Sequence, residues 1–367
     1  MVTNIPECIT QKAIENSSAK LNPEGSILVA MYGATIGKLG ILTFPATTNQ
    51  ACCACIEYPA VEQMYLFYFL YAHKEEFIRL GGGGAQPNIS KDIIIKTPIP
   101  IPPINEQKRI VAEIKKYLLF LEQIEDGRSS LEHAASNFKT KVLDLAISGR
   151  LVPQDPSDEP AIELLKRINP DFKACDISQY PYDIPCSWQF ATLGEVTSFL
   201  SRGKSPKYSE ERKYPVFAQK CNQWEGITLE KVQFLEPSTL QKWPDEYKLQ
   251  DGDVLINSTG TGTLGRTGIF YKNILGGYPF ILPDSHVTVV RGNKEILSQE
   301  YLFLISRSLY MQKWMIDNMV GSTNQKELYP KALEGFMLAI PPRAEQDRIV
   351  SYVKRLIDKV QSLVQNI

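Results

Sequence analysis

The sequence predicts an α+β fold in which two mixed α/β domains, mostly β-sheet with short helices, are separated by long helices that pair as an antiparallel coiled coil. Three observations support this prediction. The chain has 367 residues, enough for two domains of ordinary size. Its two halves repeat each other, and each half closes with a long series of apolar residues at helical spacing. A content of 43% hydrophobic and 22% charged residues is typical of a chain that buries a core.

The repeat begins with two strands and a turn. Residues 25–42 (GSILVAMYGATIGKLGIL) match residues 252–270 (GDVLINSTGTGTLGRTGIF), and apolar runs on both sides of a Gly- and Thr-containing turn predict paired strands. The run YLFYFL at 65–70 is then matched by YLFLIS at 301–306, and each predicts a short helix. A period this long indicates two duplicated domains, because solenoid repeats span only about 20 to 50 residues.

Both halves end in the same motif, IPPINEQKRIV at 101–111 and IPPRAEQDRIV at 340–350, followed by an apolar stripe. The first stripe predicts a helix of about 40 residues, or roughly 60 Å at 1.5 Å per residue, which would act as a spacer. We expect the two stripes to bury each other as an antiparallel pair; the alternative is that each helix docks on its own domain. The stripe positions are Ile110, Ile114, Tyr117, Leu118, Leu121, Ile124, Leu131, Ala135, Phe138, Val142 and Leu145 in the first copy, and Ile349, Val353, Leu356, Ile357, Val360 and Leu363 in the second.

These signals divide the chain into five parts. The predicted parts are a first domain at 1–104, a spacer helix at 105–150, a linker with one short helix at 151–187, a second domain at 188–340 and a second helix at 341–367. The second domain has a long stretch between Trp188 and Gly252, whereas only 24 residues precede Gly25. The first domain is therefore predicted to be truncated at its N-terminus.

The composition restricts the function. Lys and Arg number 40 against 41 Asp and Glu, and this balance counts against a nucleic-acid binder, which usually has a basic excess. A local basic cluster nevertheless lies within residues 201–214 (SRGKSPKYSEERKY). The chain shows neither a secretory signal pattern nor an apolar run of about 18 residues, so we expect a cytoplasmic protein that does not enter the membrane.

The motifs that resemble nucleotide, metal or catalytic sites are incomplete in this chain. GTGTLG at 260–265 is followed by a strand-like run rather than the helix that a dinucleotide site needs, and GATIGK at 33–38 is one residue too short for a P-loop. The three histidines, at 73, 133 and 286, have no partners at metal-ligand or nucleophile-activating spacing. The cysteines at 52, 53 and 55 are expected to be buried thiols. We predict no catalytic residue, no cofactor and no metal.

At this point the segments resemble a known family, the specificity subunits of type I restriction-modification systems. The resemblance rests on the strand–turn–strand at 25–42, NQACCACI, IPIPPINEQKRIV and GRLVPQDPSDEPAIELL in the first part of the chain. In the second half it rests on SWQFATLGEV, SRGKSPKY, PVFAQKCNQWEG, the second strand–turn–strand, PDSHVTVV and IPPRAEQDRIV. It covers nearly the whole chain, apart from the front of the first domain, where SRGKSPKY and PVFAQKCN have no counterpart.

The resemblance implies a non-catalytic subunit whose two target-recognition domains read the halves of a split sequence in double-stranded DNA. Its implied partners are two adenine methyltransferase subunits and the motor-nuclease restriction subunits. The alternative is a truncated scaffold or regulatory fragment that binds methyltransferase subunits through its helices and no longer reads DNA. An enzyme is the least favoured reading.

Polar and basic side chains in the matching loops are the expected DNA contacts, because Arg and Lys can bind phosphates or guanine and Asn suits adenine. In the second domain these are Arg202, Lys204, Ser205, Lys207, Tyr208, Lys220, Asn222, Ser258, Thr259, Thr261, Thr263 and Arg266. In the first domain they are Tyr32, Thr35, Lys38, Asn88 and Lys91.

Overall fold

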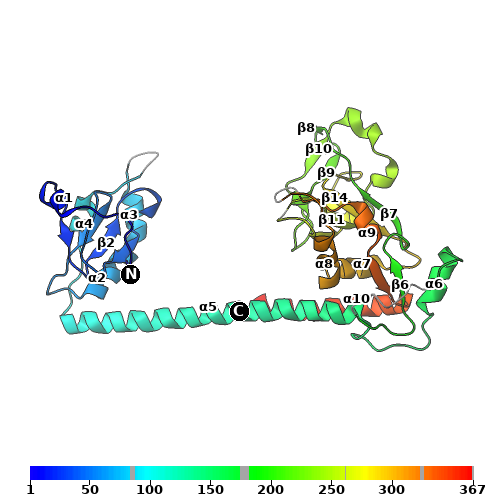
Figure 1. Cartoon of the computed structure of the whole chain (residues 1–367), viewed down its shortest axis with the longest axis horizontal. Coiled ribbons are helices and arrows are strands. Elements are labelled where there is room, and N and C mark those ends of the chain that lie inside the picture. Colours follow the sequence, from blue (N-terminus) through cyan, green and yellow to red (C-terminus); the bar gives the residue numbers. More distant parts are fainter. Residues whose placement is uncertain (83–86, 174–181, 261, 323–325, 366–367) are drawn as a thin grey trace. The chain divides into compact units, whose positions relative to one another are not determined.

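The computed structural model describes residues 1–82, 87–173, 182–260, 262–322 and 326–365 (Figure 1). The chain divides into two compact units, residues 1–127 and 128–367. Each unit mixes mostly antiparallel sheet with short helices, so the predicted α+β class is confirmed.

Unit 1 is built around a three-stranded antiparallel sheet in the order β3-β2-β5. Its core includes Ile27, Val29 and Phe77, which are all at most 1% exposed. The strands are β1 (Leu21–Asn22), β2 (Ile27–Ala30), β3 (Leu39–Ile41), β4 (Ala46–Thr47) and β5 (Cys52–Cys55). The short helices are α1 (Gln11–Glu15), α2 (Gln63–Ala72), α3 (Lys74–Leu80) and α4 (Lys91–Lys96), with a 3-10 turn, η1, at Gly33–Thr35.

Unit 2 has a four-stranded sheet in the order β12-β11-β14-β7, a second sheet β13-β9-β10-β8 and the pair β15-β6. The strands are β6 (Gln189–Thr192), β7 (Thr197–Arg202), β8 (Tyr208–Ser209), β9 (Pro215–Phe217), β10 (Gln233–Leu235), β11 (Val254–Asn257), β12 (Thr267–Ile269), β13 (Leu282–Pro283), β14 (Val287–Gly292) and β15 (Met337–Ile340). The helices are α6 (Ala161–Ile168), α7 (Gln299–Ser306), α8 (Leu309–Asp317) and α9 (Pro330–Glu334), with 3-10 turns η3 (Gln219–Cys221), η4 (Pro237–Lys242), η5 (Asp245–Tyr247) and η6 (Lys272–Leu275).

The two units share one plan, as the repeat predicts. The antiparallel pair β2–β3 corresponds to β11–β12, and α2 corresponds to α7. Gly25 and Gly252 both have a positive φ, 85° and 86°, which glycine adopts without strain. A Cβ at either position would also collide with the matching glutamine, Gln63 or Gln299. Both copies of the repeat therefore need a glycine at this position.

A glutamine attaches each long helix to its own domain in the same way. In unit 2 the side chain of Gln346 accepts a hydrogen bond from the Ser298 amide at 2.7 Å and donates to Ile296 O and Pro341 O at 2.9 and 3.0 Å. In unit 1 Gln107 accepts from the Glu62 amide at 2.8 Å and donates to the carbonyls of residues 60 and 102 at 2.9 and 2.8 Å. Both glutamine side chains are fully buried, so the Gln of the repeated motif is structural.

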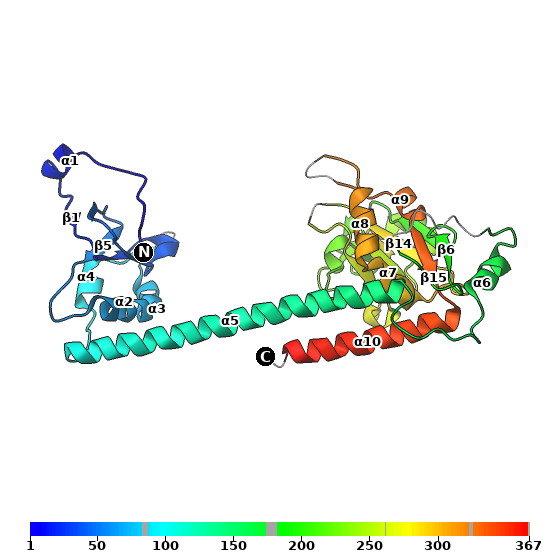
Figure 2. The ribbon, with the colours of Figure 1, turned by 60° about the horizontal axis from the view of Figure 1, so that its bottom comes forward.

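The long helices are α5 (Ile104–Ile147) and α10 (Arg343–Gln365). Gly127 does not interrupt α5, as predicted. Within unit 2 the C-terminal part of α5 contributes Val142, Ala146 and Ile147 to the same core as Ile349 and Val353 of α10. Figures 1 and 2 show α10 beside this end of α5, running in the opposite direction.

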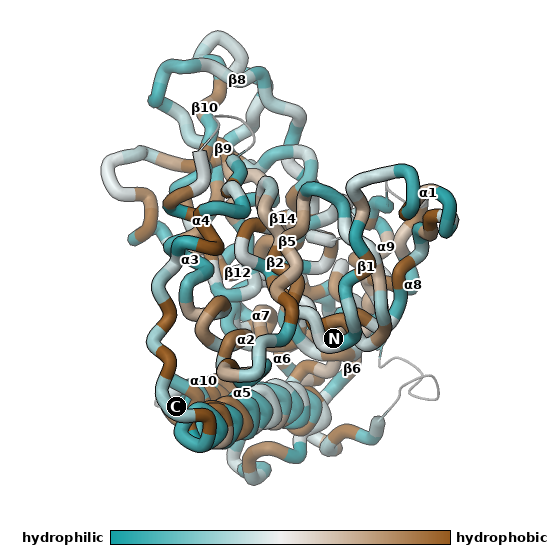
Figure 3. The backbone as a smooth tube through the Cα atoms, turned by 90° about the vertical axis from the view of Figure 1, so that its left-hand side faces the viewer, coloured by the Kyte–Doolittle hydropathy of each residue, from teal (hydrophilic) through white to brown (hydrophobic). Residues whose placement is uncertain are grey.

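Helix pairing does not cover the whole apolar stripe of α5. Tyr117, Leu118, Leu121 and Ile124 are 63%, 42%, 54% and 49% exposed, and Leu363 of α10 is 63% exposed. Figure 3 looks nearly along α5 and shows apolar and polar positions around it. The expectation that the full stripe is buried is therefore wrong for these residues.

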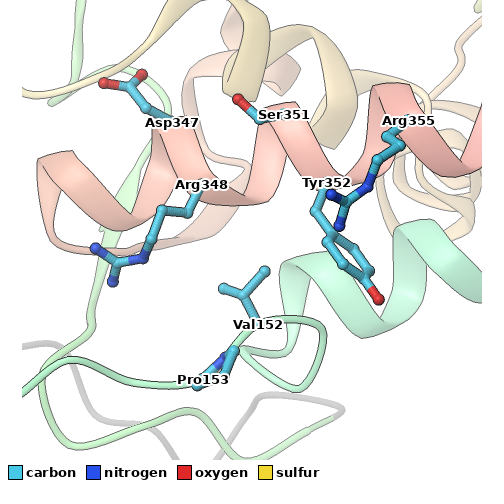
Figure 4. A pocket seen from close by; sticks show the side chains of 7 residues that line it. All are labelled: Val152, Pro153, Asp347, Arg348, Ser351, Tyr352 and Arg355. Carbon is cyan, nitrogen blue, oxygen red and sulfur yellow. The ribbon is translucent and has the colours of Figure 1, made fainter.

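Segment 149–160 holds the start of α10. Arg348 forms an ion pair with Asp158, and Val152 and Pro153 line a cavity of about 450 Å³ with α10 residues that include Arg348 and Tyr352. Figure 4 shows Val152 and Pro153 on one side of this space and α10, with Arg348 and Tyr352, on the other. The beginning of the predicted linker is therefore packed on α10, and the predicted short helix follows it as α6.

Candidate nucleic-acid interface

In unit 2 several loops meet in a group of polar side chains that we term the polar loop cluster. Thr259 lies at its centre, where its hydroxyl contacts Nδ1 of His286 at 2.9 Å and Oε1 of Gln219 at 3.3 Å. Thr263 reaches the same Gln219 oxygen at 3.1 Å. Gln219 lies in the loop after β9, Thr259 and Thr263 lie in the loop after β11, and His286 lies in the loop after β13. The cluster is made up of Ser205, Gln219, Thr259, Thr263, Ser285 and His286.

The cluster is partly open to solvent. Ser205 and His286 are exposed, Gln219, Thr263 and Ser285 are half-buried, and Thr259 is 9% exposed. Ser205 is tied in through its hydroxyl, which lies 3.2 Å from Oγ of Ser285. The arrangement offers hydroxyl, amide and imidazole groups on fixed loops, and such groups can donate to or accept from phosphates and base edges.

Four of the predicted cationic residues already have partners within the chain. Arg202 bonds Glu327 at 3.1 Å and the carbonyls of Ser258 and Leu328 at 3.0 Å each, so its main contacts are structural. The other three bond to neighbouring loops: Lys204 to Lys242 O at 2.7 Å, Lys220 to Gln233 at 3.0 Å, and Arg266 to Gly262 O at 3.1 Å and to Gln223.

Two predicted contacts are fully buried. The Asn222 amide donates to the carbonyls of Leu255 and Arg266 at 3.0 and 3.1 Å, and the Ser258 hydroxyl lies between Ile256 O and Thr288. Both residues are 0% exposed, because short polar side chains in a glycine-rich turn satisfy backbone groups there. Asn222 and Ser258 are therefore not accessible to DNA in this structure. Thr261 lies outside the described residues.

The remaining predicted residues of unit 2 are accessible. Lys207 is exposed, and within the described part of the chain its ammonium group has no ion pair or hydrogen bond. Tyr208 is 42% exposed and follows Lys207 at the start of β8. With Ser205 they place one cation, one ring and one hydroxyl on a single accessible loop.

In unit 1 the five predicted residues gather on two adjacent segments. Tyr32 and Asn88 form a backbone bridge, and the Gly33 amide donates to Pro87 O at 2.8 Å. Thr35 and Lys38 lie on the same turn as Tyr32, and Lys91 begins α4 just after Asn88. All five side chains are exposed.

Unit 2 repeats this junction with different residues. Thr259 forms a backbone bridge to Glu327 as Tyr32 does to Asn88, and the Gly260 amide donates to Lys326 O at 3.1 Å as Gly33 does to Pro87 O. The scaffold is thus conserved between the halves while the side chains on it differ.

Electrostatics at the polar loop cluster involve two carboxylates. Burial raises the pKa of Asp284, which is 3% exposed and accepts a hydrogen bond from the His286 amide at 2.9 Å. The hydrogen bond from Arg202 lowers the pKa of Glu327 and keeps that side chain ionised. A negative charge beside the cluster explains why Arg202 is held inward.

Sequence reasoning missed Gln219 and His286, although both lie in segments that carry the resemblance. Their side chains meet Thr259 across 40 and 27 residues of sequence, so no local spacing reveals the group. An exposed Trp224, 40% accessible beneath the guanidinium of Arg307 at 5.8 Å, was also missed.

The predicted cysteine strand is β5, where Cys53 is buried and Cys52 and Cys55 are half-buried. Hydrogen bonding to Cys55 lowers the pKa of Cys53 to about 7. Among the described residues no group of three or more His, Cys, Asp or Glu side chains is placed to hold a metal ion. None of the helices in the described ranges is long and apolar enough to span a bilayer.

Two copies of one domain, each joined to a long helix and each presenting different side chains on the same loop junction, define a protein of duplicated domains. The family pattern of the type I restriction modification DNA specificity domain matches residues 3–132 and 185–367. The chain belongs to this family. The curated relatives that it matches are specificity subunits of type I restriction enzymes, in agreement with the resemblance seen in the sequence.

Individual relatives are distant. The chain is 22% identical over 382 residues to the EcoEI type I restriction enzyme specificity subunit of Escherichia coli, covering 84% of this chain and 63% of that protein. It is 23% identical over 346 residues to the EcoAI specificity subunit of Escherichia coli, covering 78% of this chain and 57% of that protein. The chain thus spans less than two thirds of either relative.

The fold is also found in a solved structure concerned with complex assembly and conformational transition of the type I R-M system. That chain has a TM-score of 0.65 and 19% identity, with 95% of this chain and 78% of the other covered. The likeness supports the fold.

Proposed function

We propose that this protein binds double-stranded DNA through unit 2 and supplies sequence specificity to partner methyltransferase and restriction subunits, acting in the cytoplasm. The observation that carries the proposal is the polar loop cluster, in which the Thr259 hydroxyl bonds the side chains of both Gln219 and His286 and so fixes them on a loop surface. Held side chains read base edges better than mobile ones, because less rotamer entropy is lost on binding.

The accessible groups divide into two roles. Lys207, together with the exposed Arg212 and Lys213, would contact phosphates and position the duplex. Gln219 and His286 would face base edges in a groove. Thr35, Lys38 and Asn88 would serve unit 1 in the same way, giving two half-sites in a bipartite target, with α5 setting their separation and two methyltransferase subunits bound to the helices.

The direct test is selection of DNA from a random duplex pool by the purified full chain, followed by sequencing of the bound fraction. A recurrent motif is expected, and a Gln219→Ala variant should lose preference at one position of that motif. An enriched pool without any motif, or equal enrichment by the wild type and the variant at every position, would contradict the assignment of the cluster.

A second candidate function is a scaffold for methyltransferase subunits that does not read DNA. The observation that favours it is the exposed apolar part of α5, where Tyr117, Leu118 and Leu121 are 63%, 42% and 54% accessible. Such a stripe suits a partner helix. Capture of the methyltransferase subunit by a chain that selects no DNA motif would establish this function in place of the first.

A further inference from the structure

Unit 2 contains a two-stranded segment for which unit 1 has no counterpart among the described residues. This covering segment, residues 188–202, consists of Trp188, β6 and β7. Strand β6 pairs with β15, and β7 pairs with β14 at the margin of the main sheet. In unit 1, β5 occupies the place of β14, and within the described ranges it pairs only with β2.

The outer edge of β5 carries backbone groups in the right positions to accept a strand. The Met31 amide donates to Ala51 O at 2.8 Å, and residues two apart direct their backbone groups to the same side. Residues 51, 53 and 55 therefore face β2, whereas Cys52, Ala54 and Ile56 face outward. In unit 2 the corresponding edge of β14 is covered, with the Gly203 amide bonded to Val287 O at 3.0 Å.

A second acceptor lies just before α5. In unit 2 the Leu193 amide donates to Phe336 O at 2.7 Å, so the residues of β15 that bond β6 are 336, 338 and 340. By the repeat these correspond to Thr97, Ile99 and Ile101, while Pro98 and Pro100 fall on positions that do not donate to such a partner. The prolines are thus compatible with an added strand.

The geometry of this second acceptor is already in place. The Tyr65 hydroxyl bonds Pro100 O at 2.8 Å, as the Tyr301 hydroxyl bonds Ala339 O at 3.2 Å in unit 2. This contact fixes residue 100 with its carbonyl directed into the domain. Ile101 is 56% exposed, whereas its counterpart Ile340 is fully buried under β6.

Two charged residues complete the comparison. In unit 2 Glu345 is fully buried and accepts hydrogen bonds from Trp188 Nε1 at 2.9 Å and Gln154 at 2.5 Å. Arg348 is paired with Asp158. The matching residues at 106 and 109 are also Glu and Arg but are exposed, and the described residues of unit 1 provide no partner for either side chain.

We propose that the surface formed by the outer edge of β5, residues 97–101 and Glu106 binds a Trp-led pair of β-strands with the chemistry of residues 188–202. The strands add to both edges, and the indole N–H donates to the Glu106 carboxylate. The synthetic peptide used below has this chemistry.

The chain's own covering segment does not serve this role. Trp188 is 1% exposed in the core of unit 2, and Arg202 at its other end bonds Glu327 and two carbonyls there. Removing the segment would expose that core and leave the Glu345 carboxylate buried without its indole donor, which is costly.

The test uses the full chain and a fluorescein-labelled synthetic peptide with the sequence of residues 187–203, followed by fluorescence anisotropy without DNA. Saturable binding is expected, together with slower hydrogen exchange of the amides of residues 52–56. A Trp→Ala change at the second peptide position and an Ala54→Pro change in the chain should each weaken binding by at least about tenfold, since the first removes an anchor and the second an edge donor.

Two controls keep the result specific. Ala54→Pro leaves the β2 ladder intact because the Ala54 amide faces outward, and circular dichroism verifies the fold. Glu122→Ala, an exposed change elsewhere on α5, should bind the peptide as the wild type does. No saturable binding, binding unaffected by both weakening changes, or protection only at residues 287–292 would overturn the proposal, and each outcome is independent of DNA recognition.

Discussion

Replacing Gln346 by Ala should destabilise unit 2 through loss of the clamp that holds α10. The change removes the acceptor of the Ser298 amide and the donor to Ile296 O and Pro341 O, all in a buried environment. One buried amide without a partner costs about 1–3 kcal/mol and each of the two lost donors to a carbonyl about 0.5–1.5 kcal/mol, giving about 2 to 6 kcal/mol in total. For a unit of this size that lowers Tm by about 2–4 °C per kcal/mol.

Intrinsic fluorescence can assign the effect to one unit. All four tryptophans, at 188, 224, 243 and 314, lie in unit 2, so their unfolding transition reports that unit alone. Urea unfolding of Gln346→Ala should shift this transition to lower urea. The matched Gln107→Ala, which breaks the same three bonds in unit 1, should shift circular dichroism and leave tryptophan fluorescence in place.

The exposed Gln361→Ala on α10 is the control for helix substitution. If Gln346→Ala and Gln361→Ala differ by less than about 0.5 kcal/mol, the range of ordinary surface changes, the buried glutamine does not hold the helix as argued.

Further predictions concern DNA binding and pH. Lys207→Ala should weaken binding to all sequences alike and reduce the slope of log K against log salt by about 1, whereas an unchanged slope in a salt titration would remove Lys207 from the phosphate contacts. His286→Ala should relax one base position at a cost of about 1–3 kcal/mol, measured by competition between single-base variants of the selected motif. Burial raises the pKa of Asp284, so its contribution to stability is present at low pH and is lost as pH rises through the folded value. Asp284→Asn should therefore gain stability relative to the wild type in urea unfolding as pH rises above about 4, the ordinary pKa of an aspartate. A difference that does not change with pH would argue against the raised pKa. Deleting whole turns from α5 should shorten the spacing between half-sites in mapped methylation sites, and an unaltered spacing would refute the spacer role.

The duplication could be predicted from sequence because it depends on patterns that recur in order. Gly25 and Gly252 precede the first strand of each repeat and adopt the same positive φ, so the sequence match reflects a shared backbone requirement. The length of α5 followed from its apolar spacing and the absence of a proline within it. The exposure of Tyr117 and Ile124 could not be predicted. Helical spacing shows that these side chains lie on one apolar face, but it does not show whether another helix packs against that face.

Less of the candidate site than of the fold could be predicted from the sequence. Asn222 and Ser258 have the side chains of base-contacting residues but lie in the interior, since the same hydroxyl and amide groups satisfy turn backbones. His286 and Gln219 form the cluster only because β9, β11 and β13 bring their loops together, and the residues involved are separated by tens of positions in the chain.

The most direct test of the account is to co-express this chain with a type I adenine methyltransferase subunit in a host without adenine methylation and to map modified adenines by single-molecule sequencing. We predict methylation at one recurrent motif, lost or relaxed at one position with His286→Ala. A subunit that co-purifies with this chain while the genome stays unmodified would contradict the proposed role in reading DNA.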